Sequence, residues 1–193
     1  MRCSIALAGA FVLALAGPVA AQTEEKPAIE IKTRAAEITI TVDKALKPFP
    51  GLTEDLLAES QRYVAKSRAD ADQEYKTNKA WFKDHRWTYD RSYAFRSLVG
   101  DRYVSILRED GTYGGGAHPN SRTDTILWDK AAKKRISIRP FFTETTDNGA
   151  TLKAMRLGII ASLKAEKKAR GAEDSDLNLI EAIEPKLLKI GPV

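Results

Sequence analysis

One short segment of this sequence places residues that could do chemistry close together. Between Gly111 and Asn120 the chain reads GTYGGGAHPN, so three consecutive glycines shortly precede a histidine. Glycine has no Cβ, which lets the backbone adopt positive φ or approach another group closely. An imidazole group can act as an acid, a base or a hydrogen-bonding group, so His118 suits these roles. The candidate ligand- or partner-binding residues are therefore Tyr113, Gly115, Gly116, His118 and Asn120.

Most catalytic interpretations of this segment lack a required part. A phosphate loop would need a lysine and a serine or threonine after the glycines, then a helix, and neither follows here. A zinc site would need more ligands than His85, His118 and the single Cys3 can provide. Nucleophilic catalysis lacks a nearby cysteine or a Gly-x-Ser-x-Gly turn. One catalytic alternative stays open, in which His118 is the acid or base and Asp110 or Asp124 orients it. We predict no metal and no cofactor.

The interpretation that we favour is a structured loop that binds a ligand or supports folding. In it, the ring of His118 is hydrogen-bonded and packed on the sheet. A purely structural role is the third alternative. In that case His118→Ala lowers the melting temperature, and alanine at Gly115 or Gly116 lowers it further wherever φ is positive.

The first residues have the pattern of a secretory signal peptide. Arg2 precedes an apolar run of about 13 residues, and Val19-x-Ala21 then provides small residues before a polar glutamine. A membrane-spanning helix needs about 20 apolar residues, so the run is too short to be one. We expect residues 1–21 to be a cleaved signal peptide and residues 22–28 a flexible leader. The mature protein is then periplasmic or secreted, without a membrane span.

Composition predicts one globular domain and argues against a nucleic-acid partner. The chain has 193 residues, 43% of them apolar, with 31 Lys+Arg against 26 Asp+Glu. This length suits a single domain, which we assign to residues 29–193. The mild positive charge lies in no lysine and arginine stripe, so we predict no nucleic-acid partner. The oligomeric state is left open.

The hydrophobic pattern predicts an α+β fold. Alternating apolar and polar residues at 29–32 and 37–43 indicate strands, and an aromatic stripe with period two begins at Trp87. A helix is expected from about residue 53 to 81, with turns at 99–101 and 109–111. Further strands are expected at 102–109, 122–129 and 136–138, and helices at 147–171 and 175–188. The prediction is an antiparallel sheet with one long helix after the first strand and two C-terminal helices.

Part of this pattern resembles a known family. The segment Tyr113-x-Gly115-Gly116-Ala117-His118-Pro119-Asn120, followed by a strand and the pair Phe141-Phe142, is similar to a family of extracytoplasmic domains. These domains accompany the catalytic domain of PdaC-type peptidoglycan deacetylases and form the outer domain of RsiV-type lysozyme-sensing anti-sigma factors. The resemblance covers about residues 29–188. It implies an α+β cell-envelope module, a domain of unknown function with no settled chemistry.

The resemblance also limits what can be carried over. Family members often continue with two more strands where this sequence ends, so we expect a trimmed domain or an incomplete sequence. No deacetylase domain, sigma-binding segment or spanning helix is recognised. We therefore predict a non-catalytic binding module for a cell-envelope ligand or for a protein such as a lysozyme-type hydrolase. The alternative is a hydrolase that acts on envelope glycans or peptidoglycan through His118.

Overall fold

The computed structural model describes residues 26–146 and 148–171. The predicted signal peptide, most of the leader and the second predicted C-terminal helix lie outside these residues. The described elements are β1 (Ile29–Lys32), β2 (Ala36–Val42), α1 (Pro50–Thr77), β3 (Trp87–Val99), β4 (Tyr103–Tyr113), β5 (Asn120–Asp129), β6 (Lys134–Ile136) and α2 (Ala150–Ala169), with short 3-10 helices at Lys44–Leu46, Trp81–Lys83 and Arg139–Phe141. The chain is therefore α+β, as predicted.

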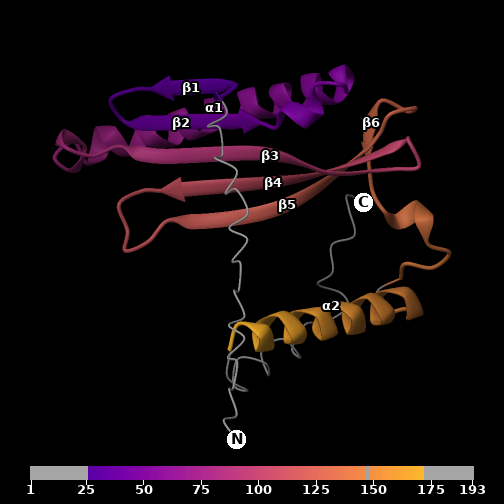
Figure 1. The fold of residues 1–193 in the computed structure, drawn as a ribbon. Coiled ribbons are helices and arrows are strands. Elements are labelled where there is room, and N and C mark those ends of the chain that lie inside the picture. The colour runs from indigo at the N-terminus through magenta and orange to yellow at the C-terminus, as the bar shows by residue number, and fades with distance from the viewer. Residues whose placement is uncertain (1–25, 147, 172–193) are drawn as a thin grey trace, which may run out of the picture.

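The strands form one six-stranded sheet in the order of the sequence (Figure 1). All neighbouring pairs are antiparallel except β2 and β3, which run parallel with Ala36 opposite Trp87 and Val42 opposite Tyr93. The prediction of a wholly antiparallel sheet with the helix after the first strand is wrong in these details. The helix α1 has 28 residues and spans about 42 Å. It returns the chain to the end where β2 began, so β3 starts beside the start of β2.

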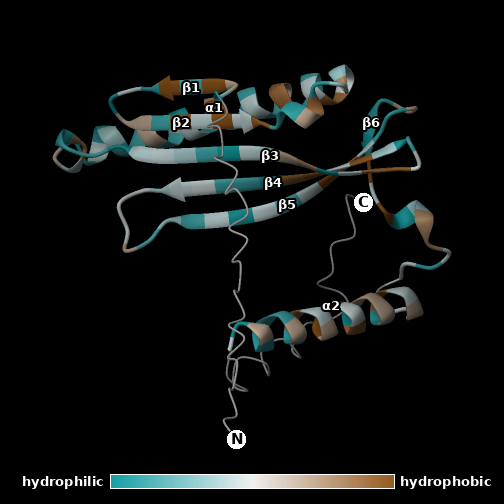
Figure 2. Cartoon of the chain, in the orientation of Figure 1, coloured by the Kyte–Doolittle hydropathy of each residue, from teal (hydrophilic) through white to brown (hydrophobic). Residues whose placement is uncertain are grey.

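The core lies between α1 and one face of the sheet. The alternating side chains predicted to point inward pack there, because every second residue of a strand faces the same side. Ile38, Ile40 and Tyr93 are fully buried, and Val42, Trp87 and Phe95 are partly buried. Figure 2 shows that β3, β4 and β5 become more hydrophobic toward the end of the sheet near β6, while their other halves are more polar. The largest fully buried apolar side chains of this layer are Ile38, Ile40, Leu46, Leu52, Leu56, Phe82, Tyr93, Val104 and Ile106.

Several predicted boundaries move in the structure: β6 spans Lys134–Ile136 rather than 136–138, and α1 ends at Thr77 rather than near residue 81. The turn expected at residues 109–111 is wrong, because β4 continues to Tyr113 and Gly111 pairs with Asp90 on one side and Ser121 on the other. The end of that hairpin therefore falls at residues 114–119. The helix starts at Pro50 rather than near Thr53, since proline suits a first helical turn, where its missing N–H has no partner to lose.

Other boundaries agree with the predictions. The turn at residues 99–101 is a tight hairpin in which Gly100 and Asp101 have φ of 56° and 50°, as a type I′ turn requires. The helix α2 is the first of the two predicted C-terminal helices. It ends just before Gly171, whose φ of 74° breaks the helix. Neither helix of the described segments has the length and apolar character to cross a membrane.

Shortening a buried leucine of α1 tests this packing. Leu56 is 0% exposed, so Leu56→Ala should remove about 2–5 kcal/mol of unfolding free energy, measured by urea denaturation. The matched control is Leu157→Ala in α2, where the side chain is 62% exposed and the change should stay within about 0.5 kcal/mol. Equal losses at both positions would contradict the packing of α1 on the sheet.

Candidate functional site

The end of the β4–β5 hairpin brings the predicted binding residues together. We call residues 113–120 the hairpin tip: Tyr113 ends β4 and Asn120 begins β5. Seven consecutive residues, 114–120, are exposed. The tip therefore presents a continuous stretch of chain to solvent.

His118 is hydrogen-bonded but not packed on the sheet. Its Nδ1 donates to the carbonyl oxygen of Pro119 at 3.1 Å, which requires the proton on Nδ1. The residue is exposed. The expected packing of the ring is therefore wrong, and the Nε2 edge is left available to a ligand.

The glycines of the tip lie against two tryptophans. A Cβ on Gly114 would approach the indole of Trp87 to 3.2 Å, and a Cβ on Gly115 would collide with the indole of Trp81. Gly115 also has a φ of 91°, a conformation that other residues rarely adopt. Gly116 has no neighbour within 4 Å. The close approach to the rings therefore requires glycine at position 115 and leaves little room for a side chain at position 114.

These tryptophans belong to an aromatic cluster, which we call the aromatic seat: Trp81, Phe82, His85 and Trp87. Trp81 stacks on His85 with centroids 4.8 Å apart and meets Phe82 edge-on at 4.8 Å. Phe82 is 1% exposed and lies 6.2 Å from Trp87, which joins the seat to the core. The seat therefore fixes the base of the tip.

Sequence reasoning missed most of this seat. The aromatic stripe beginning at Trp87 was assigned to an inward strand face, but nothing linked Trp81 or His85 to the glycine run. The usable signal was the glycine run itself, because consecutive residues without side chains allow a backbone to lie flat on a ring.

The carboxylates expected to orient His118 are bound elsewhere. Asp110 accepts two hydrogen bonds from Arg91, Nε to Oδ1 at 2.6 Å and Nη2 to Oδ2 at 2.8 Å. Asp124 accepts from Arg108 and forms an ion pair with Arg122 at 2.9 Å. The geometry thus gives the catalytic alternative no acid–histidine pair. Among the described residues, no group of three or more His, Cys, Asp or Glu could hold a metal ion.

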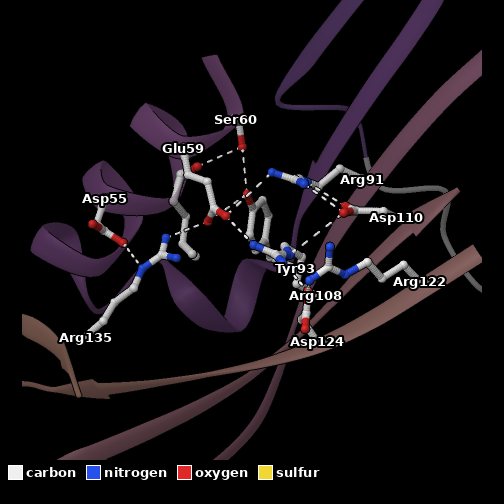
Figure 3. Close-up of polar contacts among 11 residues, drawn as sticks. Asp55, Glu59, Ser60, Arg91, Tyr93, Arg108, Asp110, Arg122, Asp124 and Arg135 are labelled. Carbon is white, nitrogen blue, oxygen red and sulfur yellow. Dashed lines mark hydrogen bonds and ion pairs between the residues drawn. The ribbon is translucent and has the colours of Figure 1, made fainter. Parts of the chain in front are cut away.

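Both aspartates belong to an ionic network between α1 and the sheet (Figure 3). Its centre is Glu59 of α1, which accepts hydrogen bonds from Arg108 and from Arg135, the latter at 2.6 Å. Arg91 lies 3.7 Å from the same carboxylate and is only 7% exposed. The hydroxyl of Tyr93 also donates to Glu59 at 3.3 Å. The network therefore ties α1 to β3, β4 and β6.

The ion pairs of the network keep Glu59 and Arg91 in their charged forms. Burial alone would raise the pKa of Glu59, but Arg135, Arg108 and Arg91 outweigh it and hold the pKa below its usual value of 4.5. Burial would lower the pKa of Arg91, but its bonds to Asp110 outweigh that effect and raise it. Neither group exchanges a proton near neutral pH, so we assign both to holding the fold.

Comparison with known proteins reveals likenesses of fold alone. No protein-family model and no curated protein matches the chain. A DUF3298 family protein from Pseudomonas aeruginosa PAO1 is 19% identical with a TM-score of 0.45, over 76% of this chain and 64% of that one. A DUF3298 family member from Bacteroides fragilis NCTC 9343 is 15% identical with a TM-score of 0.39, over 72% and 67%. The chain thus spans just under two thirds of the first protein's length. Its structural neighbours are proteins of an uncharacterised family, and the resemblance to PdaC-type and RsiV-type domains stays a prediction.

Alanine at the two central glycines should separate their roles. We expect Gly115→Ala to lower the unfolding free energy by at least about 1–2 kcal/mol, because alanine is strained at positive φ and its methyl group meets Trp81. Gly116→Ala, which adds a methyl group in open space, should leave the melting temperature unchanged or slightly raised. If thermal unfolding shows equal effects, the tip does not rest on the seat as described.

Removing the central carboxylate should destabilise the protein in a pH-dependent way. Glu59→Gln removes the carboxylate that three arginines share, but each arginine keeps a second carboxylate partner, Asp110, Asp124 or Asp55. We therefore expect a loss of about 1–3 kcal/mol at neutral pH. Because the pKa of Glu59 is lower in the folded chain, its contribution is complete above 4.5 and is lost as pH falls through the folded value. Urea denaturation of both proteins between neutral and acid pH should therefore show the difference shrinking below pH 4.5.

The matched control is Glu54→Gln, on an exposed position of the same helix. It should change stability by less than about 0.5 kcal/mol. A Glu59→Gln loss that is independent of pH would mean that the ion pairs are not its cause.

Proposed function

We propose that the mature chain is a non-catalytic binding module of the cell envelope and that the hairpin tip is its contact surface. The observation that carries the proposal is the exposed tip, residues 114–120, within a run of exposed residues that continues to Thr123, on a base held by the aromatic seat. A surface that is already ordered loses little conformational entropy on binding. This arrangement suits recognition of a partner better than turnover of a substrate.

The chemistry of the tip suits a ligand rich in hydroxyl and amide groups. Residues 111–121 contain no lysine, arginine, aspartate or glutamate. His118 and Asn120 offer hydrogen-bond donors and acceptors, and Tyr113 offers a ring with a hydroxyl group. Envelope glycans, peptidoglycan and the surface of a lysozyme-type hydrolase all present such groups. Because the tip carries no fixed charge, its binding should depend only weakly on salt.

The compartment supports the same class of ligand. The pattern of residues 1–21 predicts export, and the PdaC-type and RsiV-type domains that the sequence resembles face the cell envelope. We therefore propose a periplasmic or secreted location, with peptidoglycan or a lysozyme-type hydrolase as the partner.

Retention on immobilised baits tests this proposal. The protein, purified after export from cells that express the full sequence, is passed over purified peptidoglycan and, separately, over lysozyme. The bound fraction is measured at low and at physiological salt. We expect retention on one bait. The double variant His118→Ala with Asn120→Ala should reduce retention at least tenfold without changing the melting temperature, because both side chains are exposed.

The matched control is Gln61→Ala, which removes an exposed amide on α1. It should be retained like the wild type. Failure of the wild type to bind either bait at low salt would overturn the proposal. Binding that the tip variant leaves unchanged would remove the tip from the contact surface.

A further inference from the structure

A cavity of about 410 Å³ lies at the opposite end of the sheet from the hairpin tip. It opens between the first turn of α1 and the turn that joins β5 to β6. Its position follows from the strand register: Trp128 in its wall pairs with Val104, while Asn120 of the tip pairs with Thr112. Eight residues of β4 separate these pairs, or about 27 Å. The cavity is therefore distinct from the proposed contact surface.

The walls of the cavity are apolar and aromatic. Phe49 and Pro50 form one side, and the indole of Trp128, only 6% exposed, forms another. Gly51 leaves space in front of the indole, since a Cβ there would lie 3.8 Å from its Cζ2 atom, in van der Waals contact. A cavity of this volume with aromatic walls is typical of sites for small molecules.

Two lysines border the same cavity. Lys130 is held in place, because its Nζ donates to the carbonyl of Asp101 at 2.8 Å and lies 5.5 Å from the ring centroid of Phe49. Lys133 is exposed and, in the part of the chain that the structure describes, has no ion-pair partner. The lining contains one carboxylate, Glu54, so its formal charge is positive.

The surroundings of the cavity add to this charge. A second hollow of about 300 Å³, on the other side of the same chain segment, is lined by Lys26, Lys44 and Lys47. Its aspartate, Asp43, accepts from the backbone N–H groups of Ala45 and Phe95 with its two oxygens. This end of the molecule therefore attracts anions, and the attraction is strongest at low salt.

The backbone at Lys133 is a further unusual feature. Its φ is 50°, a region in which glycine or asparagine is more stable than lysine. A lysine at this turn position thus brings a cation to the cavity at the expense of local stability. Replacing Lys133 should therefore weaken anion binding without destabilising the fold, so that the two effects can be measured separately.

We propose that the cavity binds a small organic anion. An aromatic or acyl group of the ligand enters between Phe49 and Trp128, and its phosphate or carboxylate group meets Lys130 and Lys133. Both parts are needed, because an exposed ion pair in water contributes little by itself. Free metabolites and the end of an envelope polymer share this chemistry.

Calorimetric titration with 1-naphthyl phosphate tests the proposal, with 1-naphthol and inorganic phosphate as matched half-ligands. We expect saturable 1:1 binding of 1-naphthyl phosphate and at least tenfold weaker binding of each half-ligand. The affinity should fall as salt increases. No saturable binding of 1-naphthyl phosphate, or equal binding of 1-naphthol, would overturn the proposal.

Variants of the cavity lining test whether 1-naphthyl phosphate binds in the cavity. Lys133→Asn should weaken binding of 1-naphthyl phosphate at least fivefold while the melting temperature stays the same or rises. Gly51→Leu should abolish binding, because its side chain occupies the space before Trp128, and its melting temperature confirms that it folds. Lys134→Asn, at an exposed neighbouring lysine outside the lining, is the control and should bind like the wild type. If Lys133→Asn and Gly51→Leu bind like this control, the site is not in the cavity.

Soluble peptidoglycan fragments that carry a terminal carboxylate are titrated in the same way. If they bind as tightly as 1-naphthyl phosphate, and Lys133→Asn weakens their binding, the end of the envelope polymer is the source of the ligand. Binding of 1-naphthyl phosphate without binding of such fragments would identify a free small molecule. Either source supports the cavity site. The result is independent of the hairpin tip, since the His118→Ala and Asn120→Ala double variant should bind 1-naphthyl phosphate normally.

Discussion

The attachment of α1 to the sheet through Glu59 is the interaction on which both proposed sites depend. Its carboxylate contacts arginines from three strands, Arg91, Arg108 and Arg135. These are partly desolvated ion pairs, and satisfying every charge is what makes such burial tolerable. The ion pairs also fix the orientation of α1 on the sheet, because the carboxylate of Glu59 can contact all three guanidinium groups in only one orientation of the helix. Apolar packing around Leu52 and Leu56 would allow more sliding than these bonds do.

The position of α1 on the sheet in turn sets the positions of the cavity wall at its first turn and of the aromatic seat beyond its last turn. Its first turn forms a wall of the cavity through Pro50 and Gly51. Beyond its last turn the chain enters the short 3-10 helix Trp81–Lys83, which supplies Trp81 and Phe82 of the aromatic seat. The seat in turn decides where the hairpin tip can lie, since Gly114 and Gly115 contact its rings. A displacement of α1 would therefore disturb both sites, although they are far apart.

Local patterns predicted much of the fold, but not which strands are neighbours. Period-two alternation identified β1, β2 and the start of β3, and the Val99-Gly100-Asp101 turn was found from its residues. Alternation reports which face a residue occupies and contains no information about the adjacent strand, so the parallel β2–β3 pair was missed. The ionic network was missed for a related reason. Arg91 lies in phase between Tyr89 and Tyr93, and the pattern therefore places it inside, but a single arginine does not indicate its partners.

The candidate site was likewise predicted from residues close together in the sequence, and its long-range contacts were missed. The glycine run and His118 were found from residue types, and the hairpin does bring Tyr113 and Asn120 to the same end. The contact of the glycines with the aromatic seat joins residues about 30 positions apart, and no local pattern contains it. The exposure of His118 likewise follows from the way in which the seat supports the glycines and leaves the following residues outside.

Amide chemical-shift mapping by NMR tests the central claim, binding through the hairpin tip, most directly. On addition of lysozyme, or of soluble peptidoglycan fragments to the Lys133→Asn variant, the account predicts shifts at residues 113–120 and at the indole N–H groups of Trp81 and Trp87. The amides of β1 should not move. Saturable shifts centred on any other surface, with the tip unperturbed, would contradict the account.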